Sequence, residues 1–279
     1  MLKVAIQGIA GCYHEAAAVK YFDGQQVVPV CCSSFEQLFG ALAEDMSLPG
    51  IVAIENTIAG SLLPNYELLR RSDLSIIGEY KLRISHVLAA LPGENIETLT
   101  EVNSHPIALM QCENFLKSHP YLKIVETSDT AESARDIVEG QLTGHAAICS
   151  ERAANIYGLD ILARGIETNK HNFTRFLIVA DRSSERASRS NRKIDKASLV
   201  FTLPHTQGSL SKVLTILSFY DVNLTKIQSM PIIGREWEYR FYVDVSFDDP
   251  VRYRQSIEAI RPLLNDFRSL GEYEAFQDK

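Results

Sequence analysis

Short apolar runs alternate with helical patterns through the first 180 residues, and this alternation limits the fold more than any other feature. The runs and the patterns between them cover Val4–Ile6, 14–21, Val27–Cys32, 35–44 and Gly50–Ile54. Because short buried strands that alternate with helices form parallel sheets, the pattern predicts an α/β fold. Ligands on such sheets bind at the carboxyl ends of strands, which is where Gly8, Gly11, Glu55 and Asn56 lie in this pattern.

A second α/β set follows in the same part of the chain. Its expected strands and helices cover 81–91, 107–118, 124–126, 131–139, 146–149 and 151–157. Turns that start helices expose free N–H groups, which favour anions together with the helix dipole. Two such sets that face one another would form a cleft for a carboxylate-bearing metabolite, and we expect the second lobe at about 81–165.

A polar segment divides the chain. Residues 181–196 are rich in Ser and Arg, have few apolar side chains and predict a solvated linker. After it, the expected strands and helices cover 197–203, 208–220, 223–231, 238–247, 256–267 and 273–276. This βαββαβ order is the ferredoxin-like arrangement. We therefore expect a domain over 1–180, a linker over 181–196 and a smaller domain over 197–279.

Composition excludes several classes of function. The net charge of −7 gives no electrostatic support for nucleic-acid binding, and no apolar run reaches the roughly 20 residues of a membrane helix. The N-terminus enters a strand-like run and resembles no signal peptide, so a cytoplasmic location is expected. Five cysteines without C-x-x-C spacing and scattered histidines predict neither disulfides nor a metal site. The glycine spacings match no nucleotide-binding loop, so no cofactor is expected.

One polar pair precedes an apolar run near the end of the first domain. Thr174 and Arg175 lie between Phe173 and Phe176 in the segment Asn172–Phe176. Arg binds a planar carboxylate through a bidentate fork, and Thr is a small donor that can reach a leaving oxygen. Taken alone, the segment is more typical of an ordinary strand edge than of a binding site.

Seven segments in order resemble one known family. They are Gln7–Ala17, Ile54–Ser61 (with Thr57 where Ser is usual), Ser104–Cys112, Asp129–Ala134, Ala146–Ser150, Tyr157–Leu159 and Asn172–Phe176. The chain resembles a prephenate dehydratase over essentially its full length. The resemblance implies a two-lobed catalytic domain like that of periplasmic binding proteins, followed by an ACT domain that senses phenylalanine. It also implies the decarboxylating dehydration of prephenate to phenylpyruvate without a cofactor.

The resemblance assigns expected roles to the motif residues. Thr174 is expected to donate a hydrogen bond or relay a proton to the departing hydroxyl, and Glu55 either supplies a proton or orients Asn56. Arg175 is expected to pair either with a substrate carboxylate or with a protein carboxylate. The other residues expected to bind substrate are Asn56, Ser61, Ser104, Gln111 and Phe176.

The ACT part departs from the family at its two effector motifs. They read Gly208-Ser209-Leu210-Ser211 and Gln228-Ser229-Met230-Pro231, and the second has lost both usual charges. The residues expected to bind the effector are Gly208, Ser209, Leu210, Asn223, Leu224 and Ser229. We expect a homodimer or homotetramer with weak phenylalanine inhibition. Two alternatives are an arogenate dehydratase, whose substrate has an amine in place of the side-chain ketone, and a noncatalytic amino-acid sensor.

Overall fold

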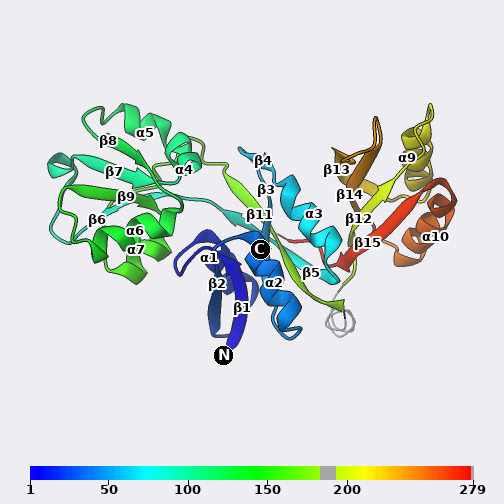
Figure 1. Cartoon of the computed structure of the whole chain (residues 1–279), viewed down its shortest axis with the longest axis horizontal. Helices are drawn as coiled ribbons and strands as arrows, with labels where there is room; N and C mark the ends of the chain where they lie inside the picture. The colour runs from blue at the N-terminus through cyan, green and yellow to red at the C-terminus, as the bar shows by residue number, and fades with distance from the viewer. Residues whose placement is uncertain (183–192, 278–279) are drawn as a thin grey trace. The chain divides into compact units, whose positions relative to one another are not determined.

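The computed structural model describes residues 1–182 and 193–277, and the chain divides into two compact units (Figure 1). The first unit consists of Met1–Ala41, Gly50–Leu62 and Tyr80–Phe176. The second consists of Leu42–Pro49, Leu63–Glu79 and Leu177–Lys279. Within the described residues, no helix is long and apolar enough to cross a membrane.

The first sheet has six strands and forms the first lobe. Its order is β2-β1-β3-β11-β5, and β4 pairs with β3. The strands are β1 Leu2–Gln7, β2 Val27–Cys32, β3 Gly50–Asn56, β4 Gly60–Ser61, β5 Leu74–Arg83 and β11 Phe173–Asp181. The accompanying helices are α1 Tyr13–Tyr21, α2 Phe35–Glu44 and α3 Leu63–Arg71. Strand β1 is parallel to both β2 and β3, which confirms the predicted parallel α/β arrangement.

The second sheet has five strands and lies between two layers of helices in the second lobe (Figure 1). Its order is β10-β6-β9-β7-β8, with strands β6 Val87–Ala90, β7 Glu101–Ser104, β8 Lys123–Glu126, β9 His145–Cys149 and β10 Asp160–Arg164. One face carries α4 Pro106–Gln111 and α5 Glu113–Lys117, and the other carries α6 Thr130–Glu139 and α7 Glu151–Tyr157. A short 3-10 helix, η1 Ile96–Thr98, precedes β7.

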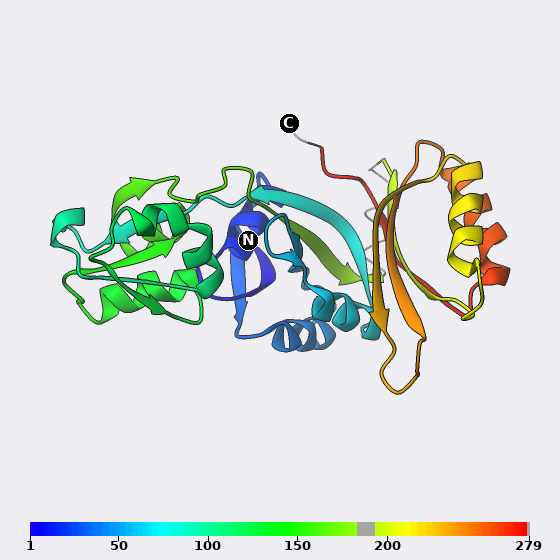
Figure 2. The same cartoon turned by 90° about the horizontal axis from the view of Figure 1, so that it is seen from above.

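The third sheet is antiparallel, with the order β13-β14-β12-β15. Its elements are β12 Lys196–Thr202, α9 Ser209–Phe219, β13 Asn223–Pro231, β14 Tyr239–Ser246, α10 Pro250–Ile260, η2 Arg261–Leu263 and β15 Asp266–Tyr273. Figure 2 shows the two helices on one side of the four strands. The βαββαβ prediction is therefore confirmed.

Three predicted elements have different bounds. The single strand expected over 81–91 is wrong, because the chain turns at Ser85 and His86, where the His86 main-chain N–H donates to Glu167 at 3.0 Å. The helix expected over 256–267 is also wrong. It begins at Pro250, because Asp249 accepts from the N–H groups of the first turn and Pro suits a first helical position. The last strand consequently runs over 266–273 and not over 273–276.

The predicted linker lies mainly outside the described residues, and its end is buried. Lys196 belongs to β12, is 8% exposed and places its Nζ 2.8 and 2.9 Å from the two carboxylate oxygens of Glu79. The expectation that residue 196 lies in a solvated linker is therefore wrong. Removing either partner of a buried ion pair leaves an unpaired buried charge, so this pair fixes the start of the third sheet to β5 at Glu79, within the second unit.

Helix α3 is fixed to the third sheet through one carboxylate in the second unit. Glu67 accepts hydrogen bonds from Arg70 and Arg71 of its own helix, and from Arg240 and Tyr242 of β14 at 3.2 and 2.8 Å. The bond from Arg70 is the main cause that lowers the pKa of Glu67 to about 2, and bonds from Tyr242 and Arg71 add to it. The Tyr66 and Tyr242 rings also pack with centroids 5.1 Å apart.

Candidate functional site

The two lobes of the first unit meet where several strands end. The turn at Gly11 lies between β1 and α1, and the main chain there contacts the start of α7 in the second lobe. Ser150 donates from Oγ to the carbonyl of Gly11 at 2.6 Å. Gly11 has φ +92°, and a Cβ there would lie 2.7 Å from the Cα of Ala153. Only glycine allows this approach.

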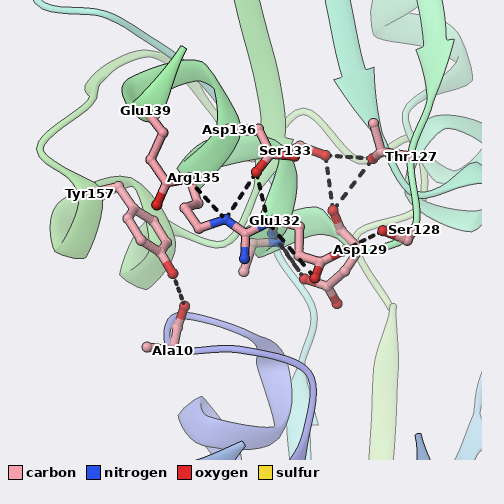
Figure 3. Close-up of polar contacts among 11 residues, drawn as sticks. Ala10, Thr127, Ser128, Asp129, Glu132, Ser133, Arg135, Asp136, Glu139 and Tyr157 are labelled. Carbon is pink, nitrogen blue, oxygen red and sulfur yellow. Dashed lines mark hydrogen bonds and ion pairs between the residues drawn. The ribbon is translucent and has the colours of Figure 1, made fainter. Parts of the chain in front are cut away.

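Two further contacts join the same faces. Tyr157 of α7 donates from its hydroxyl to the carbonyl of Ala10 at 3.0 Å (Figure 3). Arg152 pairs with Glu15 at 2.6 Å, and Glu15 is 3% exposed. Glu15 also accepts from the main-chain N–H of Gly11 at 2.5 Å. These contacts fix one side of the region between the two lobes, which the sequence predicts to be a cleft.

Asp129 caps the helix that approaches this side of the cleft. Its Oδ1 accepts from the N–H groups of Ala131 and Glu132 at 2.7 and 3.2 Å (Figure 3). A Cβ on Gly8 would lie 3.6 Å from the other carboxylate oxygen, so the two lobes are close here as well. Burial raises the pKa of Asp129 above its usual value.

Asn56 has a single orientation at the other side of the cleft. Its Oδ1 accepts from the main-chain N–H groups of Ile58 and Ala59 at 2.9 and 2.8 Å. Because main-chain N–H groups only donate, the oxygen must face them and Nδ2 must face the opposite way. Nδ2 lies 3.0 Å from Thr174 Oγ1 and 2.9 Å from Asn172 Oδ1.

The orientation of Asn56 determines what the Thr174 hydroxyl does. Thr174 Oγ1 accepts from Asn56, and within the described residues its own proton has no acceptor. Thr174 is 9% exposed and begins β11 beside the end of β3. The hydroxyl is therefore a hydrogen-bond donor without an acceptor among the described residues.

Gln111 belongs to the same network. Its Oε1 accepts from Asn172 Nδ2 at 2.9 Å and lies 2.8 Å from His86 Nε2. His86 Nδ1 in turn lies 2.8 Å from the hydroxyl of Tyr13. Three predicted residues, Asn56, Gln111 and Thr174, are therefore brought together by Asn172.

The remaining predicted substrate residues lie in different surroundings. Ser104 is fully buried, and its Oγ donates to the carbonyl of Ile148 at 2.6 Å inside the second lobe. Phe176 is 1% exposed, and its ring packs edge-on against His14 with centroids 5.1 Å apart. Ser61 pairs with Glu55 across β4 and β3. The structure thus gives Ser104 and Phe176 roles in packing the lobes.

Arg175 does not share a face with Thr174. Successive side chains of a strand point to opposite faces, so Arg175 points away from the face of β11 that carries Thr174. By the same alternation, Glu55 points away from the face that carries Asn56. Arg175 and Glu55 therefore share one face of the sheet, which favours pairing of Arg175 with a protein carboxylate.

The expected effector residues separate into two groups in the third sheet. Ser209 and Leu210 line a cavity of about 120 Å³ with Leu203, His205 and Trp237. Gly208 precedes α9 with φ +79°. Asn223, Leu224 and Ser229 lie instead on β13, where Asn223 is opposite Ser246 of β14.

Sequence reasoning assigned no role to two residues of the network, Asn172 and Tyr13. Asn172 is fully buried and joins Asn56 to Gln111. Its signal was present, since it is the first residue of the segment that contains Thr174. Tyr13 lies in the first of the resembling segments, Gln7–Ala17, but its contact with His86, 73 residues away, could not be predicted from the sequence.

The fold and the site define a two-lobed α/β enzyme in which a network of uncharged hydrogen-bonding side chains joins the lobes. A family model of prephenate dehydratase matches residues 4–184. The chain belongs to the prephenate dehydratase family and is an enzyme of the lyase class.

Similar sequences and solved structures agree with this family assignment. "Arogenate dehydratase/prephenate dehydratase 2, chloroplastic" of Arabidopsis thaliana is 37% identical over 98% of this chain and 72% of its own length. Arogenate dehydratase 1 of Petunia hybrida is 38% identical over 98% of this chain and 66% of its own length. The Arthrobacter aurescens prephenate dehydratase in complex with L-Phe superposes with a TM-score of 0.85 at 25% identity, covering 98% and 90%. GqqA, described as a quorum quenching acylase, superposes with a TM-score of 0.86 at 27% identity, and the match covers 98% of both chains.

Proposed function

We propose that the enzyme converts prephenate to phenylpyruvate, carbon dioxide and water. The observation that carries the proposal is the Thr174 hydroxyl, which accepts from Asn56 and keeps its proton for a ligand. A donor fixed before the reaction stabilises charge that develops on a departing oxygen.

The chemistry balances without an oxidant or reductant. The bond between the ring and its carboxylate breaks, and its electron pair enters the ring as carbon dioxide leaves. The C–O bond of the ring hydroxyl breaks, and hydroxide takes one proton to become water. Aromatisation drives both steps, so the protein has to stabilise only the leaving oxygen and bind the two carboxylates.

The positions of the other site residues relative to Thr174 suggest their roles. Gln111 and Asn56 supply neutral amide groups beside Thr174, and Gln111 Nε2 is proposed to bind a substrate oxygen. Arg175 and Glu55 share the other face of the sheet, so we propose that Glu55 supports Asn56 through the strand. Ser61 is proposed to bind substrate from β4.

The decisive measurement is turnover. Purified protein mixed with prephenate is expected to produce phenylpyruvate, followed by its absorbance, and treatment with a chelator should leave the rate unchanged. Arogenate should be measured in parallel, because the names of the plant relatives include both activities. Absence of turnover with both substrates would leave the noncatalytic sensor as the better description.

We also propose that residues 197–279 form an ACT domain that senses phenylalanine in a homodimer or homotetramer. The βαββαβ order and the solved relative with bound L-Phe support this proposal. Free N–H groups at the start of α9 suit a carboxylate, and Asn223 is proposed to hold the ammonium group. Edge strand β13 is the natural place for a partner, because its outer backbone groups lack a strand within the described residues.

Calorimetry tests the sensing role. Phenylalanine is expected to bind the full-length protein at millimolar concentration or tighter and to lower the dehydratase rate. Asn223→Ala should weaken binding by roughly 10- to 100-fold, as for one lost hydrogen bond to a charged group. Thr225→Ala on the same strand is the matched control. No heat at millimolar phenylalanine would remove the sensing role from this chain.

The location and domain limits are further proposals. We propose that the protein is cytoplasmic, because its five cysteines are free thiols and such thiols suit a reducing compartment. We also propose a catalytic domain over 1–180 and a smaller domain that begins at Lys196 with β12, with 181–195 between them.

A further inference from the structure

Two residues without a catalytic assignment end the hydrogen-bond network that contains Thr174. His86 is 2% exposed and lies between Gln111 and Tyr13, with a distance of 2.8 Å on each side. Tyr13 stands edge-on to the His86 ring, with centroids 5.5 Å apart. From Thr174, the network therefore passes through Gln111 before it reaches His86 and Tyr13.

The sense of every hydrogen bond follows from the fixed end of the network. Asn56 must present Nδ2 to Asn172, so Asn172 accepts through Oδ1 and donates through Nδ2. The acceptor of that donation is Gln111 Oε1, at 2.9 Å. The NH2 group of Gln111 is consequently the free end of this carboxamide, and it makes no hydrogen bond within the described residues.

His86 must then donate to the same oxygen. Since Gln111 presents Oε1, the proton of the imidazole has to be on Nε2. Burial lowers the pKa of His86, so the ring is neutral and its Nδ1 is an acceptor. Burial also keeps the proton on Tyr13, whose hydroxyl donates to Nδ1 at 2.8 Å. The Ser85 carbonyl, 2.9 Å from the same hydroxyl, is the alternative acceptor.

We propose that Tyr13 and His86 are positioning residues for the dehydratase reaction, which hold the Gln111 carboxamide with its NH2 group toward the cleft. Three carboxamides separate His86 from Thr174, and carboxamides orient their neighbours but do not carry protons. The pair therefore acts through orientation. If the Tyr13 hydroxyl is removed, the other His86 tautomer becomes available. In that tautomer Nε2 has no proton to donate to Oε1, so the Gln111 carboxamide would keep only its hydrogen bond from Asn172 and be held less firmly.

The inference rests on the proposed function, and Tyr13→Phe tests it because this change removes only the hydroxyl. We expect kcat/KM for the better of prephenate and arogenate to fall about fivefold to tenfold, as for one lost hydrogen bond. Tyr121→Phe is the control, because its hydroxyl donates at 3.0 Å to one main-chain carbonyl within the second lobe. The control should keep the wild-type kinetics.

A double variant separates positioning from general stability. In a Gln111→Met background, Tyr13→Phe should have no further effect on kcat/KM, because the group it orients is gone. If the two effects are instead fully additive, or if Tyr13→Phe alone has wild-type kinetics, the inference is wrong.

The tautomer of His86 is a readout that does not require turnover. In protein labelled with ¹⁵N-histidine, the His86 ring should show a protonated Nε2 and an unprotonated Nδ1, with His86→Gln identifying the signal. A protonated Nδ1 on the neutral ring would overturn the inference. If neither substrate is turned over while the Nε2–H tautomer is found, the proposed function fails and the orientation stands as a structural fact.

Discussion

Thr174→Ala is expected to lower kcat by about 100-fold or more while KM changes much less. The hydroxyl is held by Asn56 at 3.0 Å and offers its proton toward the cleft. A bond made mainly to the departing oxygen strengthens as that oxygen gains charge, so its loss affects the transition state more than the bound substrate. Steady-state kinetics with prephenate and arogenate measure the effect.

Two further substitutions at this position sharpen the test. Thr174→Ser keeps the hydroxyl and should retain a large part of kcat, whereas Thr174→Val keeps the shape of the side chain and should behave like Ala. Near-normal kcat in Thr174→Val would show that another group assists the departure of the hydroxyl.

Lys196→Met is expected to destabilise the protein by about 3–5 kcal/mol. Lys196 and Glu79 have side chains 10% and 1% exposed and lie 2.8 Å apart. Removal of the lysine charge leaves a buried carboxylate without this cation, and this desolvation cost lowers the free energy of unfolding. Urea denaturation followed by circular dichroism measures the change.

The chain offers a matched control three residues away. Lys193 pairs with Asp195 at 3.3 Å, but its side chain is 59% exposed. Lys193→Met should therefore change stability by only about 0–1 kcal/mol. The double variant Lys196→Met/Glu79→Leu should regain part of the loss, because no charge is then left buried. If Lys193→Met and Lys196→Met lowered the free energy of unfolding equally, burial of the Lys196–Glu79 pair would not explain the effect.

Much of the candidate site was predictable, because its residues belong to short segments at the ends of strands and helices. Thr174, Asn56 and Gln111 were expected to act together, and one amide network joins them. The role of Ser104 was not predictable, since its acceptor, the Ile148 carbonyl, is determined by the pairing of distant strands. Tyr13 was missed for the same reason.

The fold was predictable where apolar periodicity is strong and less so elsewhere. Strands β2, β8 and β9 follow their apolar runs closely, whereas β5 and β6 were expected as one strand over 81–91. Helix α3 was not predicted, because polar residues interrupt its short apolar pattern and the helix depends on Tyr66 and Leu69, both 1% exposed, to pack. Helix α10 begins at Pro250 because Asp249 caps it, and apolar periodicity alone does not contain this signal.

The tight contact at Gly11 bears on how a ligand binds. Two-lobed binding proteins commonly close around their ligands by a hinge motion. Here Ser150, Tyr157 and Arg152 already bind the first lobe through atoms of the chain itself. A hinge motion at this point would have to break all three contacts. We therefore expect any opening of the lobes to occur away from Gly11, with α7 staying against the first lobe.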